Sequence, residues 1–330
     1  MPQRDVMDVV EGFCASHAVW ALHRLGVLPR LETTTEVRCL AEEFALDEQI
    51  LSAVLDYIHQ TTGLLDREGH GYRLAPDCRP YHRVAFHLEK FLGAYGATVV
   101  RTGDILQNPG TGPALRDFDA LARAFAYLQP RSPSLTAQVL RAWDVDSLLD
   151  LGCGAATLLI ELALANPQFR GWGADAGERM VRVADGHIRR AGLSDRLSVV
   201  HADVRALGDL TTLPAPEDVQ ALYGRSILNE FFADGGKAAV SVLTGLKARL
   251  PGRLLFLEDY YGRLTHDRPA DGAHGHALAQ DLTQVLSGQG LPPPDLSSWA
   301  RVYQAADCTL VKAYEGDNDG VAWFIHVVAL

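Results

Sequence analysis

One stretch of the sequence constrains the fold more than any other: an apolar run, a glycine turn and an apolar helix in direct succession. Ser147–Leu151 reads SLLDL, residues 152–156 read GCGAA, and Thr157–Ala165 has the composition of a buried helix. Glycine lets a backbone approach a ligand closely, and the first turn of a helix presents N–H groups that have no partner inside the helix. The stretch therefore predicts a strand, loop and helix that together form a ligand cradle.

Two acidic residues follow this cradle at the ends of further predicted strands. Residues 169–174 predict a second strand, and Asp175 comes directly after it. A carboxylate in that position can bind both ribose hydroxyls of a nucleoside. Residues 197–203 predict a third strand that ends in Asp203, where a carboxylate can meet an adenine amino group. The order of loop and acids predicts a nucleoside-type ligand.

Strands recur through the rest of the chain and set the expected fold class. They are predicted at residues 218–223, 253–258, 308–314 and 321–328, most of them separated by helical segments. This alternation predicts an α/β fold with a seven-stranded Rossmann-like sheet, whose last two strands form a hairpin.

The first third of the chain is predicted to be mainly helical. Helices are expected from Val6 to about Leu25, over residues 35–44 and from Glu48 to Thr61, followed by a hairpin over residues 64–74. Helix, turn, helix and hairpin are typical of a winged helix. Residues 84–128 predict more helix. We place the domain boundary at the Pro-rich residues 130–133, with a winged-helix domain over 1–130, expected to dimerise and to cover the substrate, and an α/β domain over 131–330.

With these motifs in place, the chain resembles the class I S-adenosylmethionine-dependent methyltransferases. More narrowly, it is similar to small-molecule O-methyltransferases that have an N-terminal winged-helix dimerisation domain. DLGCG at residues 150–154, Asp175 in GAD and Asp203 in HAD match the family's methyl-donor pattern, and Ala156 replaces a frequent third glycine. The resemblance implies S-adenosylmethionine as cofactor and a homodimer formed through the N-terminal helices. The residues assigned to the cofactor are Asp150, Gly152, Gly154, Asp175, Asp203 and Arg225.

The sequence departs from this family at the residue that decides the chemistry. After the fourth strand the family usually has Leu-His-Asp-Trp, and its histidine takes the proton from the accepting hydroxyl. Here residues 226–232 read SILNEFF, so that Asn229 stands in the histidine position. An amide does not accept a proton at physiological pH. Glu230, His274 and His276 are the candidate replacements, and they complete the predicted catalytic set with Asn229.

Four functions are compatible with this departure. The first is methyl transfer to a small-molecule acceptor of natural-product type. The second is a non-methylating reaction on the same fold: an elimination, a decarboxylation, a cyclisation such as aziridine formation, or a pericyclic step. The third is C-methylation of an α-keto acid assisted by a metal that Glu230, His274 and His276 would hold, because two imidazoles and a carboxylate suit iron. The fourth is a non-catalytic partner subunit. We expect the first, without a metal.

Charge and composition exclude other classes. With 41 acidic and 30 basic residues the net charge is −11, and no Lys or Arg lies between Glu42 and Asp66, where a DNA-reading helix would need cations. We therefore expect no nucleic-acid partner. No apolar run is long enough to span a membrane, and the first residues do not resemble a signal peptide, so we expect a cytoplasmic protein. Arg225, at the predicted carboxyl edge of the sheet, could also pair with an anionic substrate. Tyr95, Phe125, Tyr127 and Tyr223 are the predicted walls of the substrate pocket.

Overall fold

The computed structural model describes residues 5–127, 134–205, 216–264, 275–318 and 321–330. The described chain divides into two compact units. Unit 1 comprises residues 1–97 and 119–128, and unit 2 comprises residues 98–118 and 129–330. The predicted boundary at residues 130–133 lies outside the described residues. The segment 98–118 clusters with the sheet of unit 2, although it lies within the N-terminal third of the chain.

Unit 2 is built on a seven-stranded sheet with the order β6-β5-β4-β7-β8-β10-β9. Strands β4 to β8 run parallel, and β10 is antiparallel to both β8 and β9. The strands are β4 (Ser147–Leu151), β5 (Arg170–Asp175), β6 (Leu197–His201), β7 (Ala221–Arg225), β8 (Leu254–Tyr260), β9 (Thr309–Asn318) and β10 (Val321–Ala329). The predicted α/β sheet and its terminal hairpin are therefore confirmed. The third strand ends at His201, so Asp203 lies two residues beyond it, in the following loop.

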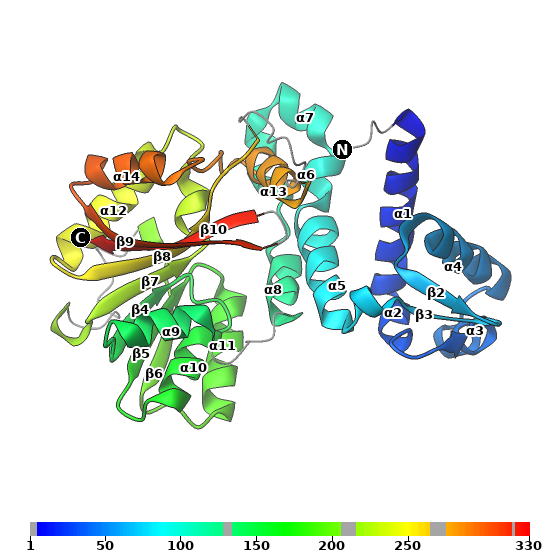
Figure 1. The fold of residues 1–330 in the computed structure, drawn as a ribbon, viewed down its shortest axis with the longest axis horizontal. Helices are drawn as coiled ribbons and strands as arrows, with labels where there is room; N and C mark the ends of the chain where they lie inside the picture. Colours follow the sequence, from blue (N-terminus) through cyan, green and yellow to red (C-terminus); the bar gives the residue numbers. More distant parts are fainter. Residues whose placement is uncertain (1–4, 128–133, 206–215, 265–274, 319–320) are drawn as a thin grey trace. The chain divides into compact units, whose positions relative to one another are not determined.

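Helices cover both faces of this sheet (Figure 1). On one face lie α9 (Leu135–Ala142), α10 (Thr157–Ala165) and α11 (Glu178–Arg190), and on the other lie α12 (Lys237–Arg249) and α14 (Leu296–Ala305). Each face has its own hydrophobic cluster, one with Leu159 and Ile188, the other with Leu243 and Trp299. Burial on both faces is why the parallel strands read as nearly continuous apolar runs.

The order of the strands fixes where a ligand can bind. From β4 the chain moves outward to β5 and β6 on one side, then returns to place β7 and β8 on the other side. At such a reversal the loops that follow neighbouring strands diverge and leave a crevice at the carboxyl edge of the sheet. The glycine loop follows β4, which is the strand at the reversal.

Two further parts of unit 2 pack near the loop that follows β7. One is α13 (Gly275–Leu286). The other is the segment 98–118, which contains α7 (Thr102–Gln107) and the 3-10 turns η3 (Pro109–Thr111) and η4 (Pro113–Leu115). α6 (Gly96–Val100) leads into this segment from unit 1. These short elements interrupt the helical stretch predicted over residues 84–128.

Unit 1 consists of helices and a small antiparallel sheet with the order β1-β3-β2. The helices are α1 (Val6–Arg24), α2 (Val27–Arg30), α3 (Val37–Phe44), α4 (Glu48–Thr62), α5 (Tyr81–His87) and most of α8 (Phe118–Tyr127), with a 3-10 turn η1 (Pro76–Cys78) and a π-helix η2 (Leu88–Ala94). The strands are β1 (Thr35–Glu36), β2 (Leu65–Glu68) and β3 (Gly71–Leu74). The predicted start of the second helix, residue 35, was wrong by two residues. α3 begins at Val37, because Thr35 and Glu36 pair with β3.

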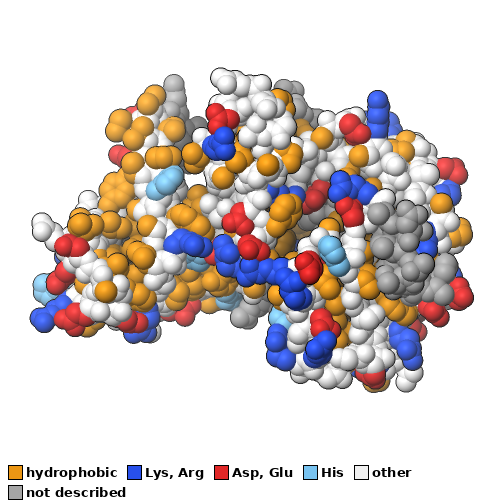
Figure 2. Space-filling model, turned by 180° about the vertical axis from the view of Figure 1, so that it is seen from behind, with side chains coloured by type: hydrophobic (Ala, Val, Ile, Leu, Met, Phe, Trp, Pro, Cys, Tyr) orange, Lys and Arg blue, Asp and Glu red, His pale blue; other side chains and the backbone are white. Residues whose placement is uncertain are grey.

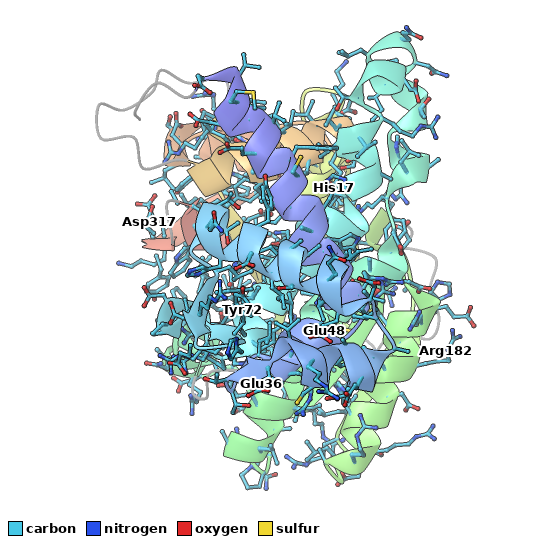
Figure 3. The ribbon with its side chains drawn as sticks, turned by 90° about the vertical axis from the view of Figure 1, so that its right-hand side faces the viewer. His17, Glu36, Glu48, Tyr72, Arg182 and Asp317 are labelled. Atoms are coloured by element: carbon cyan, nitrogen blue, oxygen red, sulfur yellow. The ribbon has the colours of Figure 1, made fainter. Side chains whose placement is uncertain are left out.

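Acidic side chains stand at the start of both helices of the helix pair α3 and α4. Glu36 precedes α3 and Glu48 opens α4, while Tyr72 is buried in the core of unit 1 (Figure 3). Within the described part of the chain, no helix is long and apolar enough to cross a membrane.

Candidate active site

The glycine loop turns sharply between β4 and α10 by means of left-handed backbone conformations. Gly152 has φ +68° and Gly154 has φ +52°, which glycine adopts without steric cost. Ala156 also has a positive φ, +58°, and caps the N-terminus of α10. The frequent third glycine of the family pattern is thus replaced by an alanine that keeps the left-handed turn.

Asp175, at the end of β5, holds the two loops of the donor side together. Its carboxylate accepts hydrogen bonds from Gly154 N at 3.0 Å and from Gly177 N at 2.8 Å. Burial raises the pKa of Asp175 above its ordinary value, and the two N–H donors oppose that rise. Each carboxylate oxygen keeps a second lone pair for a ligand hydroxyl. Asp150 lies beneath the loop in β4, where burial, and next the charge of Asp175, raise its pKa well above the usual range.

A pocket of about 180 Å³ opens at this edge of the sheet. It contains two predicted cofactor residues, Gly152 and Asp203, and one predicted catalytic residue, Glu230. The full lining is Leu151, Gly152, Ala174, Ala176, Ala202, Asp203, Val204, Arg205, Ile227, Glu230 and Phe231. Donor-side and catalytic candidates that lie far apart in the sequence therefore share one cavity.

Arg205 is a pocket residue that the sequence analysis missed. Its guanidinium pairs with both oxygens of Asp203, with Nε at 2.9 and 3.0 Å, and lies 6.0 Å from the ring of Phe231. This pairing lowers the pKa of Asp203 and keeps its carboxylate ionised. The signal that could have found Arg205 is its spacing, two residues after a predicted ligand-binding acid.

A strained turn after β7 carries Asn229 and Glu230. Ser226 has φ +50°, unusual for a residue with a side chain, and Ser226 N donates to Glu258 O at 2.8 Å. The chain then enters the 3-10 turn η7 (Leu228–Phe231). Glu230 faces the pocket with 31% of its side chain exposed, and its Oε1 accepts a hydrogen bond from Arg116 Nη2 at 2.6 Å. Backbone strain of this kind is typical of functional sites.

Asn229 points away from solvent and is 4% exposed. Its backbone N donates to Asp259 Oδ2 at 3.1 Å, and its side-chain Nδ2 donates to Gln284 Oε1 at 3.2 Å. Gln284 Nε2 in turn donates to the carbonyl of Asn229. Asn229 Oδ1 is buried with no hydrogen-bond partner among the described residues. The asparagine is therefore tied to α13 rather than placed on the pocket lining.

Asp259 is the buried acid closest to Asn229 in this network. Burial raises the pKa of Asp259 to about 8, while hydrogen bonds from Asn229 N and Tyr260 N act in the opposite direction. Sequence reasoning missed both Asp259 and Gln284, because Gln284 lies in a helix 55 residues from Asn229 and nothing in the local pattern marks it.

The remaining predicted residues of unit 2 either do not line the pocket or are outside the residues that the structure describes. Tyr223 is buried in the core cluster of α9 to α11, and its hydroxyl donates to Glu258 Oε2 at 2.6 Å, so the structure places it in the sheet core rather than on the pocket wall. Arg225 Nε pairs with Glu258 Oε1 at 3.1 Å, and its side chain is 60% exposed. His274 lies outside the described residues, and the side chain of His276 is not described. Among the described side chains, no group of three or more metal-ligating residues forms a metal site.

Three predicted wall residues belong to unit 1. Tyr95 is buried beside Ala120. Phe125 packs against Phe86 with ring centres 6.3 Å apart. Tyr127 packs edge-on against His23 and Tyr81, with ring centres 6.3 and 6.2 Å apart.

Comparison with known proteins agrees with this geometry. Residues 144–221, from just before β4 to the start of β7, match the family model of a methyltransferase domain. A 2-ketoarginine methyltransferase of Streptomyces arginensis is 26% identical over 346 residues, which cover 95% of this chain and 90% of that protein.

Solved structures share the fold over nearly the whole chain. The mitomycin 7-O-methyltransferase MmcR has a TM-score of 0.73 at 18% identity, covering 98% of this chain and 97% of its own. PigF, solved with SAH, has a TM-score of 0.71 at 15% identity, covering 100% of both chains. A pericyclic reaction enzyme has a TM-score of 0.74 at 14% identity, covering 100% of this chain and 90% of its own.

The residues present fit the cofactor of this class. The positive-φ glycines leave the loop without side chains, and a Cβ placed on Gly152 would come within 3.1 Å of Ile227 Cδ1. Asp175 and Asp203 supply the acceptors that a ribose and an adenine need. By domain match over residues 144–221, by similarity along its length and by fold, the chain is similar to methyltransferases, which supports an enzyme of the transferase class.

Proposed function

We propose that this enzyme transfers the methyl group of S-adenosylmethionine to a small-molecule acceptor of natural-product type. One observation carries the proposal: Gly152 and Asp203, which suit the donor, line the same pocket as Glu230, which suits proton transfer. When bound, the donor supplies a methyl group already activated on a sulfonium sulfur, so catalysis needs mainly alignment and removal of the acceptor's proton. Asp175 would accept the ribose hydroxyls, and Asp203 the adenine amino group.

Glu230 is proposed as the proton acceptor in place of the absent histidine. Its carboxylate faces the pocket and is held by Arg116. As the acceptor atom bonds to the methyl carbon, the carbon–sulfur bond breaks with its electron pair on sulfur, and the acceptor's proton passes to a Glu230 oxygen. Asn229 does not take part in proton transfer, because its amide is neutral. Its hydrogen bonds with Asp259 and Gln284 are proposed to fix the turn that carries Glu230.

C-methylation of an α-keto acid is the second candidate acceptor chemistry. The observation that favours it is the similarity to 2-ketoarginine methyltransferase along 95% of this chain. Here Glu230 would take a proton from the carbon beside the keto group. A metal held by Glu230, His274 and His276 belongs to this candidate, and sensitivity to a chelator tests it. Fold similarity to a pericyclic enzyme does not favour a non-methylating reaction over methyl transfer, because similarity at 14% identity shows the fold alone.

For unit 1 we propose a winged-helix dimerisation role without DNA binding. α3, α4 and the β1-β3-β2 sheet have the order of a winged helix, but α4 contains Glu48 and Asp56 and no Lys or Arg. Hydrophobic side chains gather along the exposed face of α1 (Figure 2): Val6, Val9, Val10 and Phe13. Beside them a hollow of about 540 Å³ is lined mainly by apolar residues of α1 and α4, including Ala18, Ile50 and Val54. Large exposed apolar patches mark interaction sites.

Both surfaces are mainly apolar and lie on the same helix pair, so a second copy of the chain is the proposed occupant. In a two-fold dimer the same patch serves both subunits. Tyr95, Phe125 and Tyr127 stay proposed acceptor contacts, and the domain division at residue 130 stays a proposal. A cytoplasmic location is also proposed, on the ground that S-adenosylmethionine is made inside cells.

The test is release of S-adenosylhomocysteine from S-adenosylmethionine in the presence of defined acceptors, followed by mass spectrometry. The panel contains phenols, amines and 2-oxo acids including 2-ketoarginine, each measured with and without EDTA. We expect a product heavier by one methyl group, and Glu230→Gln should lower kcat by roughly 10²–10⁴-fold while donor affinity stays unchanged. Conversion of an acceptor without consumption of S-adenosylmethionine would contradict the proposal.

A further inference from the structure

The segment that precedes α8 is held tightly against the end of α13 by two glycines. A Cβ placed on Gly112 would lie 2.0 Å from Leu286 O, and one placed on Gly288 would lie 2.7 Å from Pro113 Cγ. Such separations leave no room for a side chain, so the backbone of Gly112 contacts that of Leu286, and the backbone of Gly288 contacts the ring of Pro113. This contact fixes the 3-10 turn η4 (Pro113–Leu115) and the residue that follows it, Arg116, within unit 2.

The loop after β7 is anchored to the same region. Phe232 N donates to Gln289 O at 2.9 Å, just beyond α13, and Phe232 pairs with Gly290 in a parallel bridge. Asn229 is tied to Gln284 of α13. The segment 98–118 and the turn that bears Glu230 therefore rest on one support, the end of α13.

Arg116 uses this placement to reach Glu230. Its Nη2 lies 2.6 Å from Glu230 Oε1, and only 9% of the Arg116 side chain is exposed. The guanidinium also lies 4.7 Å from the ring centre of Phe118, which restricts its orientation. A short, charge-assisted hydrogen bond from a largely buried guanidinium fixes the direction of a carboxylate as well as its charge.

We propose that Arg116 is a positioning residue for Glu230 in methyl transfer. Arg116 holds Glu230 Oε1 and so fixes the orientation of the carboxylate that lines the pocket. This inference rests on the proposed function, in which Glu230 takes the acceptor's proton. It adds that the segment 98–118, which lies outside the methyltransferase domain match over residues 144–221, is part of the catalytic apparatus.

A merely structural ion pair would give a different set of responses. Loss of a structural pair lowers the free energy of unfolding and leaves kcat alone. Loss of a positioning cation lets the Glu230 carboxylate rotate from its productive direction, so kcat falls while the donor still binds. The readouts that separate these roles are kcat, donor affinity and the rescue of kcat in Arg116→Lys.

The first experiment compares Arg116→Gln and Arg116→Lys with the wild type, using the acceptor that gives turnover. Arg101→Gln is the matched control, because Arg101 lies in the same segment in an exposed pair with Asp104 at 2.7 Å. We expect Arg116→Gln to lose roughly 10²-fold in kcat, as for a misplaced catalytic group. Arg116→Lys should recover part of kcat, and S-adenosylhomocysteine affinity should not change in any variant.

A second pair of variants tests whether the contact between Gly112 and Leu286 positions Arg116. Gly112→Ala forces the segment away from Leu286, and it should lower kcat with donor affinity unchanged. Gly103→Ala is its control, because a Cβ on Gly103 meets nothing within 4 Å. If Gly112→Ala fails to fold, the Arg116 series alone decides, because neither Arg116 variant alters the backbone contact.

The outcomes distinguish this inference from the proposed function. Full kcat in Arg116→Gln, with a loss of kcat in Glu230→Gln, would overturn the role of Arg116 and leave the proposed function standing. Full kcat in Glu230→Gln would overturn both the role of Glu230 and that of Arg116. Absence of methyl transfer by the wild type would overturn the proposed function and this inference with it.

Discussion

Asp175 accepts a hydrogen bond from Gly154 N at 3.0 Å and thereby joins the end of β5 to the glycine loop after β4. The residue assigned to the donor's ribose is thus also the residue that shapes the loop. Donor binding and loop geometry therefore depend on one carboxylate.

Replacement of Asp175 by Asn should weaken donor binding strongly. The amide retains one acceptor oxygen, so either the loop N–H groups or the ribose hydroxyls lose a charged partner, a loss of about 1–3 kcal/mol. Calorimetric titration with S-adenosylhomocysteine should show the dissociation constant rise by roughly 10–100-fold. Asp185→Asn, in an exposed pair with Arg189, is the control and should bind normally. Equal affinity in the two variants would remove Asp175 from the donor site.

Replacement of Asn229 by His should not create an active base. Asn229 is 4% exposed and enclosed by Asp259 and Gln284, so the larger imidazole overpacks the site and costs about 1–3 kcal/mol of unfolding free energy. Urea denaturation measures this loss. The exposed Asn108→His should change stability by no more than about 0.5 kcal/mol. A stable Asn229→His variant with raised turnover would show that the pocket still accommodates the family's histidine.

The exposed apolar face of α1 predicts that one charge placed there disrupts the dimer. Phe13 is 58% exposed on α1, and an aspartate at this position would bring a charge into the proposed interface. Light scattering coupled to gel filtration should give a dimer for the wild type and a monomer for Phe13→Asp. Val311→Asp, at an exposed position on β9, should remain dimeric. A wild type that is monomeric at micromolar concentration would refute the proposed dimer.

His326 predicts a loss of stability in acid. Burial lowers the pKa of His326 to about 3, and its ring lies between the hydroxyls of Tyr303 at 2.8 Å and Tyr261 at 3.1 Å. In the unfolded chain the imidazole takes up a proton near pH 6.5, while in the folded chain it stays neutral. The contribution of His326 is therefore complete above pH 6.5 and is lost as the pH falls toward 3, by about 1.4 kcal/mol per pH unit.

The measurement is urea denaturation of the wild type and of His326→Gln between pH 7 and pH 4. The variant is expected to be less stable at pH 7 and to show a smaller fall toward pH 4. Parallel curves for the two proteins would mean that His326 is protonated in the folded state.

The sequence predicted the sheet well because its signals are local. Each parallel strand is an apolar run, and the glycine loop with Asp175 and Asp203 follows from chain order alone. The conformation of Ala156 was less accessible, since a left-handed alanine has no sequence signal of its own. The short strand β1 was missed for a similar reason: two residues form it only because β3 lies beside them.

The catalytic side of the pocket depends on contacts between distant segments, which no local pattern encodes. Glu230 was a candidate from its position after β7, but its partner Arg116 lies 114 residues earlier. Tyr223 was assigned to the pocket because it is an aromatic residue in a strand near the carboxyl edge of the predicted sheet. Its hydroxyl instead donates to Glu258 inside the sheet, a contact that the local pattern does not encode.

The central claim is that the glycine loop, Asp175 and Asp203 form a working donor site. Its most direct test is calorimetric titration of the purified wild type with S-adenosylmethionine and with S-adenosylhomocysteine, after any co-purified ligand has been removed. We predict one site per chain with a micromolar dissociation constant, about −8 kcal/mol. If neither compound gives a heat of binding, and neither competes with the other for a site, the donor site is contradicted and methyl transfer with it.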